Sequence, residues 1–223
     1  MSAKYGKTLM LHYAELAFLL EGCGIHGVLM PHGVQTALAT QLDFGQAMAG
    51  MARDGLMVEG EGGLLDYEPS LREVLLALRD SAVVLLVRSS DDAFAPLMLH
   101  VDAAGKRAVL VHEDTVRDDM ACVSAMAPGE AYEDLALVLK GGVILRDEDA
   151  EALQGLGDSS DGQKAAFKLE VFPRGTTEPV LATYVLVSYQ LEEPSQEQAD
   201  QDGNAQAPDA LFIRSLIERC VQS

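Results

Sequence analysis

The spacing of apolar residues changes near residue 82, and this change constrains the fold more than any other feature of the sequence. Before it, apolar residues recur at helical intervals, as in Leu71, Leu75 and Leu78. Residues 82–87 are instead continuously apolar, over a length typical of a buried strand. Helical and strand patterns therefore occupy different stretches of one chain, which predicts an α+β fold.

The first 80 residues are predicted to be mainly helical, with one short hairpin. The expected elements are helices over residues 9–22 and 34–53, the second broken near Gly45, a hairpin of residues 56–58 with 64–65, and a third helix from Pro69. The order helix, hairpin, helix is compatible with a winged helix, a common DNA-reading unit. A recognition helix should carry Arg, Lys or Asn toward the bases, but residues 44–54 offer only Arg53 and Gln46. Met48 and Met51 are expected on the apolar side, so such a unit fits protein contacts better than DNA reading.

Residues 81–190 are predicted to be mainly strands with intervening helices. Strands are expected over residues 82–87, 96–101, 107–111, 120–126, 165–172 and 180–189, and helices from Pro128 and around 148–156. Short turns such as Asp102-Ala103-Ala104-Gly105-Lys106 join neighbouring strands, which is typical of antiparallel hairpins. The two halves share the order helix, strands, helix. This shared order is compatible with a pseudo-two-fold duplication. The alternative interpretation is that a strand followed by a helix is common in any α+β protein.

The last part of the chain begins with a polar stretch and ends with a helix. Residues 192–207 contain five acidic residues and no basic, aromatic or β-branched ones, so residues 191–207 are expected to form a mobile acidic loop. A final helix is expected within residues 208–223, with Ile213, Leu216, Ile217 and Cys220 on its apolar face. With 223 residues and a 48% hydrophobic share, residues 1–223 are interpreted as a single domain with a sizeable core.

The formal net charge of −19 decides which partners are compatible with the chain. Such a charge repels phosphate backbones and anionic membranes unless a basic patch is present. The 16 basic residues are scattered, and the densest groups are two pairs, Lys4 with Lys7 and Lys106 with Arg107. We therefore expect no nucleic-acid partner and no membrane insertion, while another protein remains compatible. General acidity of cytosolic proteins is the explanation of the charge that we favour.

Cysteine usage and the N-terminal residues bear on the compartment. Cys23, Cys122 and Cys220 are far apart and odd in number, which is neither a disulfide framework nor a zinc pattern. Each is expected to be a small buried hydrophobic residue. Glu15 lies in the middle of the apolar stretch 9–20, which is not typical of a secretory signal. These features predict a cytoplasmic protein.

The five histidines do not form a pattern that indicates catalysis or metal binding. They are His12, His26, His32, His100 and His112. His26 and His32 flank Pro31 in a glycine-rich loop, a spacing that does not make two ligands converge. His100 and His112 lie on two arms of a predicted hairpin, where His100 should oppose about Ala108 and so lie several positions from His112. No metal, cofactor or catalytic residue is assigned.

Three acidic clusters have structural explanations. Glu113-Asp114 with Asp118-Asp119 falls in a loop between strands, and Asp147-Glu148-Asp149 falls at a predicted helix N-terminus, where negative charge is favourable. Residues 158–162 resemble a calcium loop in outline but lack the third alternating ligand and the terminal glutamate. None of the common nucleotide-binding, serine-hydrolase or zinc-protease motifs is present, which lowers the odds of an enzyme.

The order of features resembles the EspG family, the cytosolic chaperones of type VII (ESX) secretion. The resemblance is carried, over roughly the first half of the chain, by the helix at 16–20, the segment 48–56 ending in Asp54-Gly55-Leu56, and residues 67–78 leading into 83–87. It implies a central antiparallel sheet flanked by helices with a pseudo-two-fold relation, and a chaperone that shields a secretion substrate before export. The chain is shorter than is usual for that family, and no binding residues are carried over.

Three functional hypotheses follow from the sequence. The first is a non-catalytic protein-binding chaperone or adaptor, with a type VII secretion substrate as the candidate partner. The second is a transcription-associated protein built on the winged-helix-like segment, against which the charge argues. The third is an enzyme with an unrecognised site near His26 and His32.

Overall fold

The structure, a computed structural model, describes residues 8–40, 44–59, 65–90, 94–145, 164–188 and 208–221. Its centre is an eight-stranded antiparallel sheet with the order β1-β7-β6-β5-β4-β9-β10-β8. These strands are β1 (Thr8–His12), β4 (Ser81–Ser89), β5 (Leu97–Asp102), β6 (Ala108–Glu113), β7 (Met120–Met126), β8 (Gly142–Leu145), β9 (Lys164–Pro173) and β10 (Leu181–Ser188). A separate hairpin pairs β2 (Met57–Glu59) with β3 (Leu65–Tyr67).

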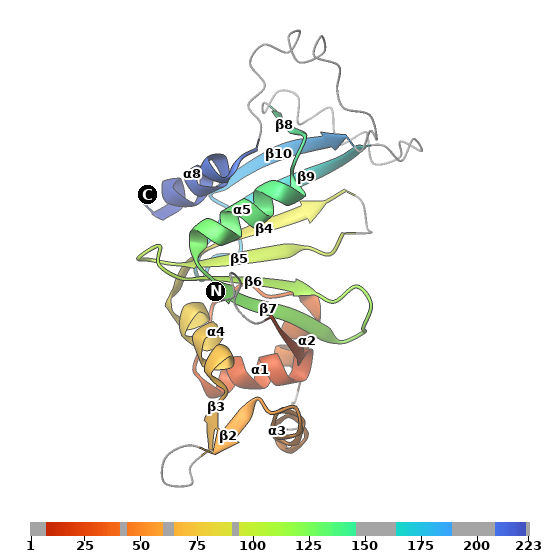
Figure 1. Cartoon of the computed structure of the whole chain (residues 1–223), viewed down its shortest axis with the longest axis vertical. Helices are drawn as coiled ribbons and strands as arrows, with labels where there is room; N and C mark the ends of the chain where they lie inside the picture. Colours follow the sequence, from red (N-terminus) through yellow and green to blue (C-terminus); the bar gives the residue numbers. More distant parts are fainter. Residues whose placement is uncertain are drawn as a thin grey trace, which may run out of the picture.

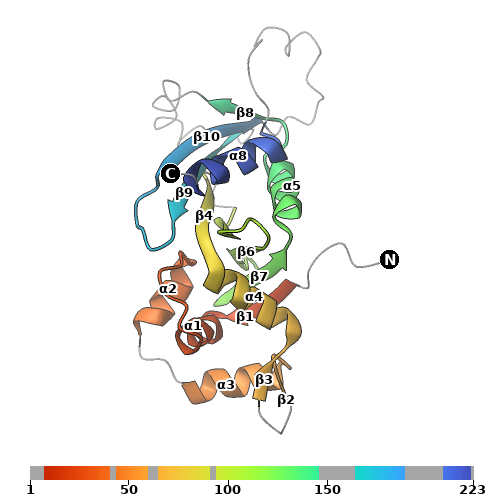
Figure 2. The same cartoon turned by 90° about the vertical axis from the view of Figure 1, so that its left-hand side faces the viewer.

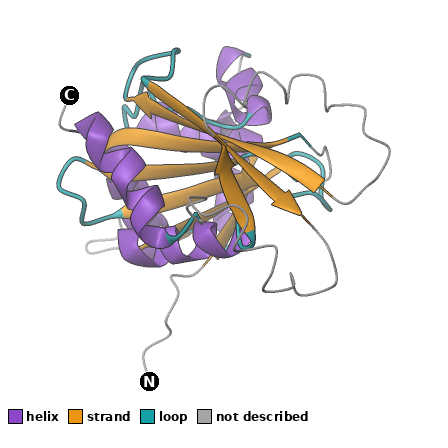
Figure 3. Cartoon of the chain, turned by 90° about the horizontal axis from the view of Figure 1, so that it is seen from above, coloured by secondary structure: helices purple, strands orange, loops and turns teal. Residues whose placement is uncertain are grey.

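Six helices are described beside the sheet, five of them packed on it or near it and α3 packed on α1 and β2, so the predicted α+β class with an antiparallel sheet is confirmed (Figures 1 and 3). They are α1 (Tyr13–Gly22), α2 (His32–Ala39), α3 (Phe44–Arg53), α4 (Pro69–Asp80), α5 (Pro128–Val138) and α8 (Ala210–Val221). Helices α1 to α4 gather at one end of the long axis, and α5 and α8 lie toward the other (Figures 1 and 2).

The central strand β4 explains why residues 82–87 are continuously apolar. Its side chains alternate between two cores: Val84 and Leu86 enter the first, and Val83, Leu85 and Val87 enter the second. The first core lies between one face of the sheet and helices α1, α2 and α4, and the second lies between the other face and helices α5 and α8. A strand buried on both faces loses the apolar-polar alternation of a half-exposed strand.

Two predicted helices were wrong at their ends or centre. Residues 9–12 belong to β1, where Leu9 and Leu11 are buried against β7 and His12 is exposed, and the helix begins only at Tyr13. The predicted helix 34–53 is two helices: α2 ends at Ala39 and α3 begins at Phe44, so Gly45 lies inside α3. Strand β8 was not predicted at all, because four residues after a helix carry too little periodicity.

The remaining predicted elements agree with the structure or lie outside it. The hairpin before α4, the strands β4 to β7, β9 and β10, and helices α4, α5 and α8 are present near their expected bounds. The helix expected at 148–156, residues 158–162 and the acidic loop at 191–207 lie outside the described residues. The winged-helix and duplication hypotheses stay predictions.

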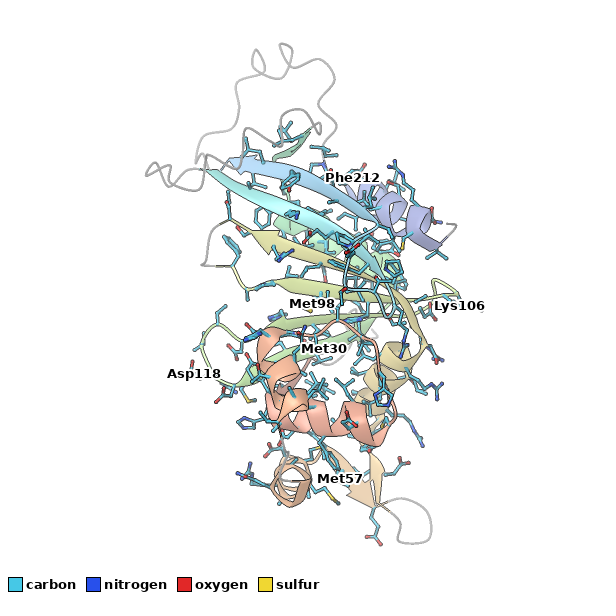
Figure 4. All side chains as sticks on the ribbon, turned by 180° about the vertical axis from the view of Figure 1, so that it is seen from behind. Met30, Met57, Met98, Lys106, Asp118 and Phe212 are labelled. Carbon is cyan, nitrogen blue, oxygen red and sulfur yellow. The ribbon has the colours of Figure 1, made fainter. Side chains whose placement is uncertain are left out.

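The segment between α1 and α2 crosses the first face of the sheet and is held there by the start of the β9–β10 turn. Figure 4 shows Met30 of this segment over the sheet near Met98 of β5. The Arg174 guanidinium donates to the carbonyl of His26 at 2.9 Å and to carbonyls at the end of α4, those of Leu78, Arg79 and Ser81. Arg174 therefore joins α4, the α1–α2 segment and β9 at one point.

Candidate protein-binding groove

Helices α5 and α8 lie side by side over the second core and leave a groove between them (Figure 1). The β5–β6 turn closes one end of this groove, which has a volume of about 570 Å³. The groove is lined by Pro128, Gly129, Tyr132 and Glu133 of α5, by Leu211, Arg214, Ile217, Glu218 and Val221 of α8, and by residues 101–105 of the turn. We call it the α5–α8 groove.

Helix α8 has a buried side and an outward row. Ile213 and Leu216 enter the second core, as its sequence pattern predicted. The outward row has Leu211, 71% exposed, at one end and Val221, 48% exposed, at the other. A helix rises about 1.5 Å per residue, so these two apolar side chains mark a groove about 15 Å long. Exposed apolar groups at both ends of one groove are compatible with a site that another protein covers.

The middle of the α5–α8 groove is polar, and its two charged side chains on α8 pair with each other. Arg214 and Glu218 form an ion pair of 2.7 Å, one helical turn apart. Tyr132 forms the floor, and its burial raises the pKa of its hydroxyl. A partner that enters the groove therefore meets an ion pair already made, flanked by two apolar ends.

The turn at the end of the groove is fixed by Asp102. Its carboxylate accepts hydrogen bonds from the backbone N–H groups of Lys106 at 2.7 Å and Arg107 at 3.2 Å. On the other side of this turn lies a second hollow of about 350 Å³, lined by Lys106, Arg107 and residues of α4 and β7. Lys106 stands at the edge of the molecule (Figure 4), and Arg107 pairs with Asp80 at 3.5 Å. The two hollows flank one rigid turn.

The structure does not bring the five histidines together as one site. His12 precedes α1 and is exposed, His26 offers its carbonyl to Arg174, and His32 begins α2. His100 opposes Val109, one position from the expected Ala108, and His112 opposes Leu97, so the prediction that they lie apart is confirmed. Within the described residues, no three His, Cys, Asp or Glu side chains gather in a way that could hold a metal ion.

His100 is the exception among them because it is buried. It is 1% exposed, and neither ring nitrogen makes a hydrogen bond of normal geometry among the described residues. Burial, with a smaller effect of the nearby Arg174 charge, outweighs an opposing contribution from the Leu29 backbone and lowers the pKa of His100 to about 3. His100 is therefore a neutral core residue at physiological pH, which the sequence pattern did not reveal.

The first acidic cluster organises the turn between β6 and β7 and its contacts with α1 and α2. The Asp114 carboxylate accepts from the N–H groups of Val116 and Arg117, and the Asp119 carbonyl accepts from the Tyr13 N–H at 2.9 Å. The Glu113 carboxylate accepts from the Gly33 N–H at 3.4 Å. Asp147-Glu148-Asp149 and residues 158–162 lie outside the described residues.

Two predictions about side-chain burial need correction. The three cysteines are each half-buried rather than buried. Met48 is 39% exposed, although it was expected on the apolar side of its helix with Met51, which is buried. Of the side chains that matter in the α5–α8 groove, sequence reasoning found those facing the core and missed Leu211 and Val221, because an outward apolar residue gives no periodic signal.

No protein-family model matches the chain, and no curated protein is significantly similar to it. The segments that resemble the EspG family fall on α1, on α3 and the turn after it, and on β3, α4 and β4. Of the helices that the structure describes, none combines the length and the apolar composition needed to span a membrane.

Proposed function

We propose that this chain is a non-catalytic protein-binding protein that holds a segment of its partner in the α5–α8 groove. The observation that carries the proposal is the outward row of α8, with exposed Leu211 and Val221 at the two ends of one groove. Contacts of this kind gain most of their free energy from a few apolar anchors that enter hollows.

The groove restricts the shape and charge of the partner segment. A length of about 15 Å accommodates about three turns of helix, with one apolar anchor for each end. Between the anchors, Arg214 and Glu218 face the partner as a neutral pair, while Glu133 and the net charge of −19 disfavour an acidic segment. A neutral or basic amphipathic helix satisfies all three conditions.

The resemblance to the EspG family supports a more specific role. A cytosolic chaperone or adaptor for a type VII secretion substrate would shield an apolar segment of that substrate before export. The described α+β fold, with its antiparallel sheet flanked by helices, is compatible with this role. The role in secretion is proposed separately from the binding of a partner in the α5–α8 groove.

A photo-crosslinking experiment tests the groove directly. A photo-reactive amino acid at position 211, in the full-length chain expressed in its native cells, should crosslink to one defined protein, identified by mass spectrometry. The same amino acid at position 116 is the matched control, since Val116 is 88% exposed but lies in the β6–β7 turn.

A binding measurement with the recovered partner then gives the contribution of the groove to the affinity. Leu211→Glu combined with Val221→Glu should weaken binding at least about tenfold, because charges at apolar anchors are costly to bury. Val116→Glu should leave binding unchanged. Equal crosslinking at positions 211 and 116, or equal affinity of the groove variant and wild type, would reject the groove as the binding site.

A further inference from the structure

A second groove lies at the end of the molecule opposite α8 (Figure 1), between the first turn of α1 and helices α2 and α3. Its volume is about 560 Å³. Small side chains form most of its walls, including Ala37 of α2 and Ala47, Ala49 and Gly50 of α3. These residues leave room for an extended aliphatic chain, which a larger side chain at these positions would fill. We call this space the α1–α3 groove.

One carboxylate in the wall of the α1–α3 groove is almost completely buried. Glu15 is 3% exposed, and its Oε2 accepts a hydrogen bond from the His12 N–H at 3.0 Å. Within the described residues, no donor reaches its other oxygen, Oε1. Oε1 approaches α3 so closely that a Cβ at Gly50 would lie 2.4 Å from it. Oε1 thus lines the groove as an acceptor within reach of a cation that enters it.

The surroundings of Glu15 are negative. Asp119 also lines the groove, and Glu113 and Asp118 act on the neighbouring Tyr13. Burial, followed by the effects of Glu113, Asp119 and Asp118, raises the pKa of the Tyr13 hydroxyl to about 12. Electrostatic repulsion from these carboxylates thus opposes any further negative charge here.

Two features of the α1–α3 groove carry positive charge, but their electrostatic effect is weaker than that of these carboxylates. Arg53 is 71% exposed and already pairs with Asp54 at 3.2 Å. The N-terminus of α1 contributes about half a positive charge, and its first N–H groups are already bonded, that of His12 to Glu15 and that of Tyr13 to the Asp119 carbonyl. The balance of charge therefore favours a cationic ligand over an anionic one.

We propose that the α1–α3 groove binds an alkylammonium group, with the ammonium at Glu15 Oε1 and the aliphatic chain along the alanine and glycine walls. A guanidinium pairs best with two free carboxylate oxygens in a planar fork, whereas Glu15 offers one. A compact ammonium needs only one, and its carbon stem gains contact with apolar walls. The ligand is either a free diamine or the side chain of a lysine in a partner protein.

A titration of the full chain followed by NMR tests the proposal. The probes are 1,5-diaminopentane, lysine blocked at both its backbone ends, and arginine blocked in the same way as the matched guanidinium. Diaminopentane and blocked lysine should shift the amide signals of Gly33 and Gly50, and blocked arginine should bind at least about threefold more weakly than blocked lysine. Tighter binding of blocked lysine identifies a protein side chain as the source of the ammonium, and tighter binding of diaminopentane identifies a free diamine.

Four variants separate Glu15 from the general acidity of the protein. Glu15→Gln keeps the oxygen that accepts the His12 N–H but removes the charge, and it should weaken diaminopentane binding about tenfold, the effect of losing one charge-assisted contact. Glu59→Gln, on the exposed strand β2, should change it less than twofold. Ala49→Phe, at an exposed wall position, should also weaken binding about tenfold without relying on Glu15. Arg53→Gln should strengthen it about twofold, since it removes a repelling charge.

The outcomes that overturn the proposal are equally definite. If diaminopentane binds the wild type and Glu15→Gln within twofold of each other, only the general negative field of the protein attracts it. If blocked arginine binds as tightly as blocked lysine, the preference for ammonium is wrong. If no probe shifts Gly33 or Gly50, the α1–α3 groove binds no alkylammonium group. None of these results depends on the partner of the α5–α8 groove.

Discussion

The two faces of the sheet are built from the same strands, yet they carry different chemistry. On β5 the first face presents Met98 and His100, and the second presents Leu99 and Val101. On β9 the first face presents Glu170, bonded to Arg88 and Lys168, while Leu169 and Val171 face the second core. The buried polar side chains His100 and Glu170 thus both lie on the first face.

The two faces therefore differ in how their contributions to stability should depend on pH. The second core consists of apolar side chains and Tyr132 under two helices, so its contribution to stability should not vary between pH 5 and 7. The first side of the molecule holds the ionisable side chains of His100, Glu15 and Glu170, all of them buried. Although burial alone would raise the pKa of Glu170, its bonds to Lys168 and Arg88 lower it, so this carboxylate is satisfied, unlike His100.

The largest expected effect on the free energy of unfolding comes from a substitution on the second face, at Leu85. Leu85 is fully buried in the second core, so Leu85→Ala should lower the free energy of unfolding by about 3 kcal/mol, through lost apolar burial and the cavity left behind. Urea denaturation at pH 7 and pH 5 measures it, with Val116→Ala as a control that should change little. A loss that differs between the two pH values would contradict the contrast between the faces.

A smaller effect is expected where α2 meets α1, at Gly33. A Cβ at this position would lie 2.0 Å from the Tyr13 ring, so Gly33→Ala should cost about 2 kcal/mol despite the better helix propensity of alanine. Gly129 in α5 is the matched control, because a Cβ there meets no atom within 4 Å. Thermal unfolding should show Gly33→Ala destabilised and Gly129→Ala unchanged or slightly stabilised; equal effects would show that Tyr13 moves aside freely.

The smallest effect concerns pH and His100. The pKa of His100 is lowered to about 3 in the folded chain, whereas in the unfolded chain it is near the ordinary value of 6.5. Between these values only the unfolded chain binds the proton, so the free energy of unfolding should fall by about 1 kcal/mol for each pH unit below 6.5. Above pH 6.5 this contribution is fully present.

A substitution isolates the contribution of His100. His100→Leu removes both unpartnered nitrogens, so it should flatten the difference in stability between pH 7 and pH 5 and leave stability at pH 7 equal or higher. Urea denaturation of both proteins at several pH values in this range, above most carboxyl pKa values, makes the comparison. Parallel pH profiles for wild type and His100→Leu would mean that the ring is protonated without cost in the folded state.

Local patterns in the sequence predicted most of the sheet, because strands separated by short turns carry their own register. The hairpin of β5 and β6 was predicted within one residue, since Asp102 and Gly105 make a turn of nearly fixed length. Strand β1 was not predicted, because its partner β7 lies more than a hundred residues later and Leu9 and Leu11 also fit a helix. A pairing between residues so far apart in the sequence cannot be recognised from the residues around either strand.

The two grooves could be predicted less well than the fold. Glu15 stands out in the sequence only as a charge within an apolar stretch, and its role at the α1–α3 groove depends on Gly50 of α3, which no local pattern connects to it. Leu211 and Val221 are similarly visible only as residues off the apolar face of α8. Contacts between distant elements decide both sites.

The place of β9 in the sheet has a consequence for synthesis. Strand β4 pairs with β5 on one side, but its other neighbour is β9, which leaves the ribosome only after α5 and β8. Until then, the nascent protein exposes an unpaired edge along its most apolar strand, a ready template for aggregation. Arg174, which fastens the α1–α2 segment to α4, arrives later still. Co-translational folding of the first half should therefore stall with β4 exposed, and a chain truncated before residue 164 should be insoluble.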